Sequence, residues 1–362
     1  MSSSLRADRI GRVVVRGANW VGDAVMTVPA LRELRRVLPG ARVTLATRAW
    51  AEGIFAGADF IDDLLVSGGG PGGARAVFAE ARAWRARRFD LALLFPNAFA
   101  PALVAALARV PARVGYATQG RAPLLTHRVE VPGWRGTRHE VFYYLNVVAE
   151  LERLLYGSSS VGSREPDTGL RDAESLKPEG ARILLDRGAR PGRPVVALCP
   201  GSTNSRAKRW PAERFAAVAD MLAERGGAEV VLIGAGEELE ISEEVARRMR
   251  ARPVVLTGRT DLAQTTAVLA YSDLLLTNDT GPAHVAAAVG CPVVVVFGPT
   301  NPLTTRPFSP TAEVVRRPPD CAPCMLRDCP IDHRCMTAVT AEEVFERASR
   351  VLEHSRKAEA VR

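Results

Sequence analysis

The sequence lacks the features that would place it in a membrane or on a secretory route. No apolar run reaches the roughly 20 residues that a membrane-spanning helix needs. The start of the chain, Met1 to Arg9, is polar and has no apolar core of a secretory signal. We therefore expect a cytoplasmic protein.

Two glycine motifs of nucleotide-binding proteins are also missing. Gly17 opens a glycine loop after a short apolar run, but no second glycine follows two residues later. The dinucleotide fingerprint Gly-x-Gly-x-x-Gly is therefore absent, and so is the phosphate loop Gly-x-x-x-x-Gly-Lys-Ser/Thr. The missing dinucleotide fingerprint weighs against the first alternative that we consider, an NAD-dependent oxidoreductase.

Aromatic residues are scarce, at 6% of the 362 residues, and no nucleic-acid-binding motif is recognisable. The net charge of +8 nevertheless favours acidic partners such as nucleic acid, anionic membrane or phosphorylated substrates. Arginines are spread along the chain, so we interpret much of this charge as solvated helix surface and expect no nucleic acid partner. The second alternative is a non-catalytic binder of anionic lipid or nucleic acid, which salt-sensitive DNA binding would support.

Short apolar strands alternate with helices twice along the chain, which predicts parallel, doubly wound sheets. The length suits two domains, which we place at residues 1–170 and 171–362, joined through a Ser-, Gly- and Pro-rich region at 157–180. We expect two Rossmann-like α/β domains that face a cleft, with a last helix that could pack back on the first domain. The expected strands are Arg12–Arg16, Arg42–Ala46, Asp63–Val66, Leu91–Phe95, Pro194–Leu198, Glu229–Ile233, Val254–Leu256, Leu274–Thr277 and Val293–Phe297. The expected helices are Asp23–Leu38, Ala49–Gly57, Ala74–Arg87, Pro211–Glu224, Leu262–Tyr271, His284–Val289 and Ala341–Glu353.

Ligands of open α/β sheets bind at the carboxyl ends of the strands, and three motifs fall at such ends. The first, Gly17-Ala-Asn-Trp-Val-Gly-Asp23, joins a strand to a helix whose N-terminus carries partial positive charge. We expect Asp23 to face the cleft. The alternative is that Asp23 only caps the helix.

The second motif is the loop Pro200-Gly-Ser-Thr-Asn-Ser-Arg-Ala-Lys-Arg-Trp-Pro211. The hydroxyls of Ser202 and Thr203, together with the mobile charge of Lys208, suit a diphosphate. The alternative is a surface loop with a solvated Lys-Arg pair.

The third motif is Thr277-Asn-Asp-Thr-Gly-Pro-Ala-His284. Backbone N–H groups at Thr280 and Gly281 can bind phosphate at a helix N-terminus. The Asp279 carboxylate can accept hydrogen bonds from sugar hydroxyls, and His284 lies one turn further on the same helix face. The three motifs together predict a nucleotide diphosphate, or a similar anion, held between the two domains.

These motifs resemble those of the ADP-heptose–lipopolysaccharide heptosyltransferases, with heptosyltransferase II as the nearest branch. The resemblance runs from about Val13 to Phe297. It is carried by Asn19-Trp-Val-Gly-Asp23, Phe95-Pro-Asn-Ala-Phe99, Cys199-Pro-Gly201 and Ala207-Lys-Arg-Trp-Pro211.

The resemblance implies a GT-B fold and an inverting transfer that requires no cofactor. It implies ADP-L-glycero-D-manno-heptose as the donor and heptosyl-Kdo-lipid A, at the cytoplasmic face of the inner membrane, as the acceptor. The protein would then be cytoplasmic or peripheral on that membrane. Heptosyltransferase I, or a later core heptosyltransferase, is the alternative within the family, because one sequence does not reveal the acceptor pocket.

The resemblance also implies roles for single residues. Asp23 matches the family's catalytic base, and Lys208 matches its lysine at the diphosphate. The other implied donor-binding residues are Ser202, Thr203, Asn204, Glu238 (at the ribose), Asp279, Thr280, Gly281 and His284.

The six cysteines fall into two groups. Cys199 and Cys291 lie in apolar strand-like runs, so we expect buried, inert thiols. The others form a cluster, with His333 inside it, that departs from the family pattern: Cys321, Cys324, Cys329 and Cys335. Four thiolates can hold zinc in a closed structural site; the alternative is a loop of reduced or partly oxidised thiols.

Overall fold

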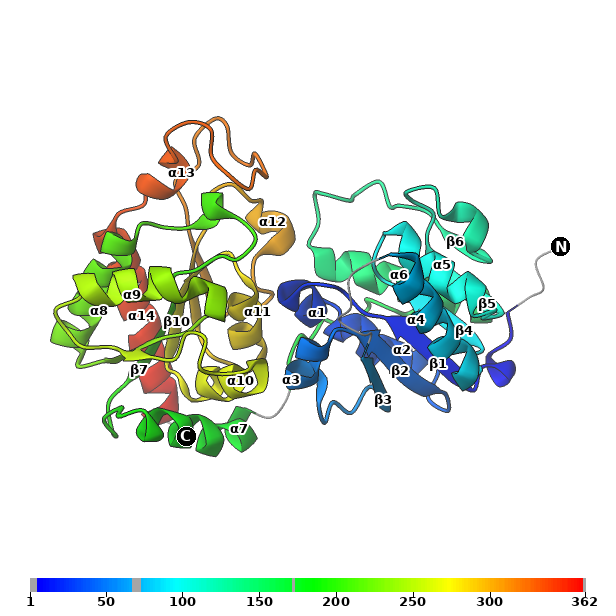
Figure 1. The fold of residues 1–362 in the computed structure, drawn as a ribbon, viewed down its shortest axis with the longest axis horizontal. Helices are drawn as coiled ribbons and strands as arrows, with labels where there is room; N and C mark the ends of the chain where they lie inside the picture. Colours follow the sequence, from blue (N-terminus) through cyan, green and yellow to red (C-terminus); the bar gives the residue numbers. More distant parts are fainter. Residues whose placement is uncertain (1–4, 67–72, 171–172, 361–362) are drawn as a thin grey trace. The chain divides into compact units, whose positions relative to one another are not determined.

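The computed structural model describes residues 5–66, 73–170 and 173–360. The chain divides into two compact units, Met1–Thr168 and Gly169–Arg362 (Figure 1). Residue 171, where we placed the start of the second domain, lies outside the described residues, as do the first four residues of the polar start.

The first unit is a six-stranded parallel sheet in the order β3-β2-β1-β4-β5-β6. Its central strands are almost fully buried, as expected of a parallel sheet with helices on both faces. The strands are β1 (Arg12–Arg16), β2 (Arg42–Thr47), β3 (Asp63–Val66), β4 (Leu91–Leu94), β5 (Ala112–Tyr116) and β6 (His127–Val129). The helices are α1 (Val21–Met26), α2 (Val28–Val37), α3 (Glu52–Phe55), α4 (Ala74–Arg87), α5 (Phe99–Leu107) and α6 (Glu140–Tyr156).

The single helix expected at Asp23–Leu38 is wrong, because the structure has two helices there. Pro29 has no N–H group, and its ring would clash with a carbonyl one turn earlier, so the first helix ends at Met26. The Thr27 hydroxyl bonds the Ala24 carbonyl at 2.6 Å at the junction. The first helix also begins earlier than expected, at Val21, with Trp20 at its cap position. Asp23 is therefore not the helix cap.

The second unit repeats the architecture, with the strand order β12-β11-β10-β7-β8-β9. All its pairings are parallel. The strands are β7 (Val195–Cys199), β8 (Glu229–Leu232), β9 (Val254–Val255), β10 (Leu274–Asn278), β11 (Val293–Val296) and β12 (Ala312–Val315). The helices are α7 (Ala173–Asp186), α8 (Ala212–Gly226), α9 (Leu239–Arg248), α10 (Leu262–Tyr271), α11 (Gly281–Ala288), α12 (Pro302–Thr305), α13 (Arg334–Thr337) and α14 (Ala341–Ala360).

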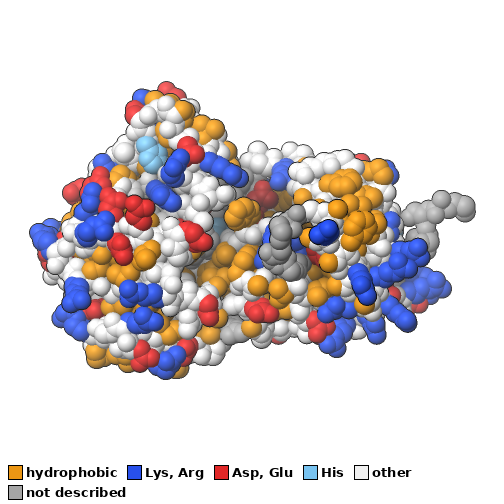
Figure 2. All heavy atoms as spheres, in the orientation of Figure 1, with side chains coloured by type: hydrophobic (Ala, Val, Ile, Leu, Met, Phe, Trp, Pro, Cys, Tyr) orange, Lys and Arg blue, Asp and Glu red, His pale blue; other side chains and the backbone are white. Residues whose placement is uncertain are grey.

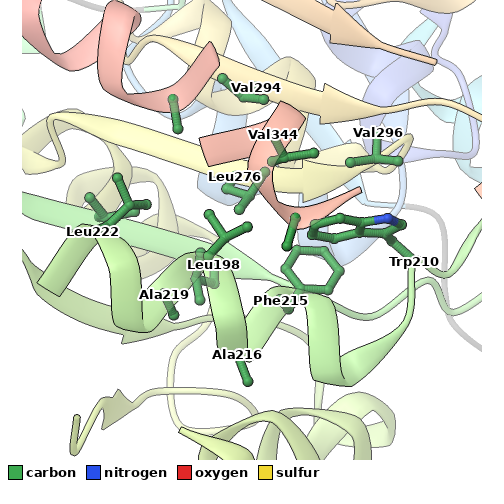
Figure 3. Close-up of a cluster of buried hydrophobic side chains, with 14 of the residues drawn as sticks. Leu198, Trp210, Phe215, Ala216, Ala219, Leu222, Leu276, Val294, Val296 and Val344 are labelled. Carbon is green, nitrogen blue, oxygen red and sulfur yellow. The ribbon is translucent and has the colours of Figure 1, made fainter. Parts of the chain in front are cut away.

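The core of the second unit explains the place of its last helix. Trp210 and Phe215 meet edge to face with centroids 5.1 Å apart, against apolar side chains of the sheet (Figure 3). Val344 of α14 packs into the same cluster, and α14 also contacts α8 and the strands β10 to β12. Each buried side chain of this size stabilises the fold by about 1.5–3 kcal/mol. The apolar face of α14 is thus covered within its own unit.

Close backbone packing places α7 on α10. A Cβ at Gly180 would lie 2.2 Å from the Ala267 carbonyl oxygen, so only glycine allows the two helices to approach this closely. The region that we interpreted as a linker, 157–180, therefore includes the start of a packed helix. The predicted pair of parallel, doubly wound sheets is confirmed. Within the described ranges, no helix is both long and apolar enough to cross a membrane.

Candidate active site

In the first unit, Asp23 sits in the opening turn of α1, directly after the loop that leaves β1. Its Oδ1 atom accepts a hydrogen bond from the Tyr144 hydroxyl of α6 at 3.0 Å. Tyr144 is buried, and its ring meets Phe95 at the end of β4 with centroids 5.5 Å apart. Burial, and next the charge of Asp23, raise the pKa of Tyr144 well above its ordinary value, so the phenol stays protonated and donates.

Glu140, the first residue of α6, places a second carboxyl group near Asp23. Burial raises the pKa of Glu140, the cation of Arg135 opposes this effect, and the charge of Asp23 adds to it. Arg135 Nη2 lies 3.9 Å from Glu140 Oε1. The Arg135 guanidinium also stacks over the Tyr143 ring, with its central carbon 3.8 Å from the ring centroid. Asp23, which follows β1, thus forms an acidic pair with Glu140, next to a cation and two tyrosines from the segment after β6.

Sequence reasoning missed Tyr144, Glu140 and Arg135. Asn97, in a motif that the resemblance used, bonds the Tyr143 hydroxyl at 3.1 Å, which ties that motif to α6. Paired tyrosines near the start of a helix were the only available signal.

In the second unit, the loop 200–210, which we call the donor loop, reaches the end of β10. Lys208 Nζ lies 2.8 Å from Asp279 Oδ2 and donates to the Asp279 carbonyl at 3.2 Å. The Thr300 hydroxyl, after β11, donates to the same carboxylate oxygen at 2.7 Å. Asp279 is 6% exposed, so its charge is held by these partners rather than by water.

Asn278, the last residue of β10, fastens both ends of the donor loop. Its Oδ1 accepts from the Trp210 N–H at 3.0 Å, and its Nδ2 donates to the Pro200 and Gly201 carbonyls at 2.8 and 3.1 Å. The oxygen and the nitrogen of this buried amide are both hydrogen-bonded, so the side chain fixes the spacing between the two ends of the donor loop. Asn278 and Thr300 were also missed by sequence reasoning.

The other predicted donor residues outside the third motif are Glu238 and the residues at the start of the donor loop. Glu238 is buried; it accepts from the Thr203 hydroxyl at 3.2 Å and from the Ala235 N–H at 2.9 Å. Ser202 is buried, whereas Asn204 is exposed at the tip of the donor loop.

The third motif opens α11, which begins at Gly281, three residues before the expected start at His284. Thr280 occupies the N-cap position, Gly281 is the first helical residue and His284 is buried one turn later. The N-terminus of α11 therefore lies directly after Asp279, and its positive end favours an anion. The structure thus brings the second and third motifs together through Lys208 and Asp279.

Residues 77–334 match the sequence profile of glycosyltransferase family 9 (heptosyltransferase). The chain belongs to this family. It is 28% identical to lipopolysaccharide heptosyltransferase 2 of Salmonella typhimurium over 84% of this chain and 88% of that protein. The E. coli ADP-heptose lipopolysaccharide heptosyltransferase II structure aligns with a TM-score of 0.79 at 25% identity, over 96% of this chain and 100% of that one. A family 9 glycosyltransferase from Veillonella parvula aligns with a TM-score of 0.80 at 25% identity, over 97% and 99%.

The predicted GT-B architecture and the assignment as a glycosyltransferase of the heptosyltransferase family are therefore confirmed. The match to an enzyme family weighs against the alternative of a non-catalytic binder. On the face drawn in Figure 2, positive and negative side chains alternate over the second unit rather than forming one basic patch. Many arginines of this glycosyltransferase are paired with carboxylates, as in Arg182 with Glu179 and Asp186.

The cysteines of this glycosyltransferase behave differently in their two groups. Cys199 and Cys291 are buried as expected, and burial raises the pKa of Cys199 to about 12, which makes it an inert thiol. Of the cluster, only Cys335 is buried. Burial raises the pKa of Cys335, and the charges of the other three cysteines add to this effect.

The four clustered thiols are not arranged as a metal site in this structure. Among the described residues, no group of three or more His, Cys, Asp or Glu side chains is arranged to hold a metal ion. Structural zinc at this cluster therefore stays a prediction.

A cavity of about 1170 Å³ in the second unit lies away from the donor loop. It is lined by residues just before the strands, including Pro194, Asp273 and Pro292, and thus opens at the amino ends of the sheet. Ligands of such sheets bind at the opposite, carboxyl ends, where the family motifs lie. Lys208 and Asp279, rather than the lining of this cavity, are therefore the candidate donor site.

Proposed function

We propose that this glycosyltransferase moves L-glycero-D-manno-heptose from ADP-heptose to the heptosyl-Kdo-lipid A inner core of lipopolysaccharide. The observation that carries the proposal is the Lys208–Asp279 pair at the N-terminus of α11, in a family 9 chain. The names of the similar proteins from Salmonella and E. coli support this donor and this class of acceptor. Heptosyltransferase I, or a later core heptosyltransferase, is the second candidate.

In the proposed reaction, the second unit binds the diphosphate of the ADP-heptose donor. Lys208 and the N–H groups of Thr280 and Gly281 would bind ADP and stabilise the charge that grows on it as the glycosidic bond breaks. Glu238, a buried carboxylate held by Thr203, would accept hydrogen bonds from the ribose hydroxyls. The ordered positions of these groups mean that little reorganisation opposes binding.

Asp23 is the proposed base, which takes the proton from the acceptor hydroxyl. The acceptor hydroxyl attacks the anomeric carbon, the bond from that carbon to the diphosphate oxygen breaks, and the hydroxyl proton passes to Asp23. ADP leaves with the electron pair of the broken bond, and the anomeric configuration inverts. Tyr144 holds the Asp23 carboxylate in place by its hydrogen bond.

This reaction requires no cofactor. Its acceptor is a lipid, so we propose that the enzyme works from the cytoplasm at the inner membrane surface. Nucleic acid is not among the proposed partners.

The test is turnover of ADP-heptose with two acceptors, Kdo-lipid A without heptose and the same lipid with one heptose. The proposal predicts that only the second acceptor gains a heptose, as measured by mass spectrometry of the lipid product. Transfer to the first acceptor would assign heptosyltransferase I instead. If the enzyme uses neither acceptor but extends a larger core, it is a later core heptosyltransferase.

A further inference from the structure

The segment that carries the clustered cysteines, Cys321–Cys335, binds the donor loop next to Lys208. We call it the cysteine segment; it forms the orange part of the chain that leads into α13 in Figure 1 and ends inside that helix. Two hydrogen bonds hold Ala207: its N–H donates to the Arg327 carbonyl at 2.9 Å, and its carbonyl oxygen pairs with His333 Nε2 at 2.6 Å. A carbonyl oxygen only accepts, so His333 Nε2 carries the proton and donates. Both backbone groups of the residue before Lys208 are therefore bound by the cysteine segment.

Further contacts extend this attachment along the donor loop. The Ser205 hydroxyl donates to the Arg327 carbonyl at 3.1 Å. Arg206 Nε lies 2.7 Å from Asp328 Oδ1. Each residue from Ser205 to Ala207 thus has a partner in the cysteine segment.

The same segment also contacts the loop on the other side of the ion pair. The Met325 N–H donates to the Pro299 carbonyl at 2.9 Å. Pro299 precedes Thr300, whose hydroxyl donates to Asp279. The cysteine segment therefore touches both loops that set the position of Lys208 relative to Asp279.

Local structure alone would hold Lys208 weakly. It ends a 3₁₀ turn of three residues, Arg206–Lys208, and such a short turn has little stability by itself. The Lys208 stem has four rotatable bonds, so the direction of its ammonium group depends on a fixed backbone. The two hydrogen bonds from the cysteine segment to Ala207 hold that backbone in place.

We propose that His333 is a positioning residue for Lys208, and that the cysteine segment is in this way part of the donor site. The inference rests on the proposed function, in which Lys208 binds the diphosphate. It gives the cysteine segment a role that does not depend on a bound metal.

The test is ADP affinity measured by calorimetry, together with the KM for ADP-heptose and the KM for the acceptor. His333→Ala removes the donor to Ala207 and should raise the Kd for ADP about three- to tenfold, the scale of one lost hydrogen bond. The KM for ADP-heptose should rise in parallel while the KM for the acceptor stays unchanged. His333→Gln, whose terminal amide can donate to the same oxygen, should restore most of the affinity.

His354→Ala is the matched control, because His354 bonds the Arg350 carbonyl within its own helix. It should leave the Kd for ADP unchanged. If His333→Ala folds poorly, Ser205→Ala removes a second contact between the same two segments and should shift the Kd in the same direction. An unchanged Kd in the folded variant overturns the proposal.

Lys208→Ala separates this inference from the proposed function. If Lys208→Ala weakens ADP binding and His333→Ala does not, the donor site stands and the role of His333 is wrong. If neither variant changes the Kd for ADP, Lys208 is not in the donor site, and both proposals fail.

Discussion

The Tyr144 hydroxyl donates a hydrogen bond to Asp23 Oδ1 at 3.0 Å and so joins α6 to α1. The two residues are 121 positions apart in the sequence. Tyr144 is buried and protonated, and Glu140 places a second carboxyl group near the same position. A carboxylate held in this way has a fixed direction, which general-base catalysis requires.

Tyr144→Phe should therefore lower kcat without unfolding the protein. The ring still packs on Phe95, but the hydrogen bond to a charged group is lost, which corresponds to about a 10- to 100-fold fall in kcat. The measurement is steady-state turnover at saturating donor and acceptor. Tyr156→Phe is the control on the same helix, because that hydroxyl bonds the distant Val37 carbonyl. Equal kcat values for wild type and Tyr144→Phe would remove Tyr144 from the mechanism.

Asp23→Asn tests the proposed base itself. Because asparagine has nearly the same shape as aspartate and its amide oxygen can still accept the hydrogen bond from Tyr144, we expect the free energy of unfolding to change by less than about 1 kcal/mol. The side chain can no longer accept a proton, so kcat should fall about 100- to 10,000-fold. The Kd for ADP should stay at the wild-type value. Near-normal turnover of Asp23→Asn with saturating substrates would contradict the assignment.

Lys208→Ala should weaken both ADP binding and the free protein. Its removal leaves the buried Asp279 carboxylate with Thr300 but without a cation, which destabilises by about 3–5 kcal/mol in comparable buried pairs. The double variant Lys208→Ala/Asp279→Asn should recover much of the free energy of unfolding but none of the ADP affinity. Urea denaturation and calorimetry measure the two effects separately. If stability and ADP affinity recover together, Lys208 acts through the fold and not through the diphosphate.

The sequence was sufficient to single out candidate residues in the segments that follow strands. Asp23 follows β1 in the first unit, and Lys208 and Asp279 follow β7 and β10 in the second; in each parallel sheet, the segments that follow the strands lie at its carboxyl edge. Their partners Tyr144 and Thr300 come from other elements, and their positions depend on packing that a local pattern does not contain.

The fold shows the same division between local and distant information. The alternation of strands and helices predicted both sheets, whereas Pro29 divided a helix that its apolar spacing had predicted as continuous. The cysteine segment shows most clearly that a local pattern does not reveal contacts with distant residues. Its spacing suggested metal chemistry, and its contact with Ala207 depends on a distant part of the chain folding against it.

Zinc at the four clustered cysteines remains a prediction for metal analysis. If zinc binds there, anaerobically purified protein should contain about one zinc per chain in tetrahedral thiolate geometry. Chelators should then lower the Tm more than kcat, because four protein ligands leave no open position for a substrate. Cys324→Ser should lose the metal, and Cys291→Ser, a buried thiol outside the cluster, should keep it. Protein without metal would leave the alternative of a loop of reduced or partly oxidised thiols.

Glu152 makes a pH-dependent contribution to the stability of the first unit. Burial would raise the pKa of Glu152, but hydrogen bonds from Ser159, Ser160 and Val161, together with Arg36, outweigh it and lower the pKa to about 2. Glutamate in an unfolded chain has a pKa of about 4.3. The folded state therefore favours the charged form, and the stabilisation is present above about pH 4.3 and is lost as the pH falls towards 2.

Glu152→Gln should reduce the free energy of unfolding by about 2–3 kcal/mol at pH 7, because the neutral amide cannot replace a carboxylate that accepts several hydrogen bonds. The difference between wild type and variant should narrow between about pH 5 and pH 3, since the wild-type stabilisation falls as unfolded chains take up protons. Urea denaturation at pH 7, 5 and 3.5 measures this difference. Glu150→Gln is the matched control, because Glu150 is a partly exposed carboxylate on the same helix and pairs only with Arg153 among the ion pairs of the described residues. If the free energy of unfolding of Glu152→Gln is below that of the wild type by the same amount at pH 3.5 and at pH 7, the variant loses packing rather than a charge interaction. The electrostatic account of Glu152 would then be wrong.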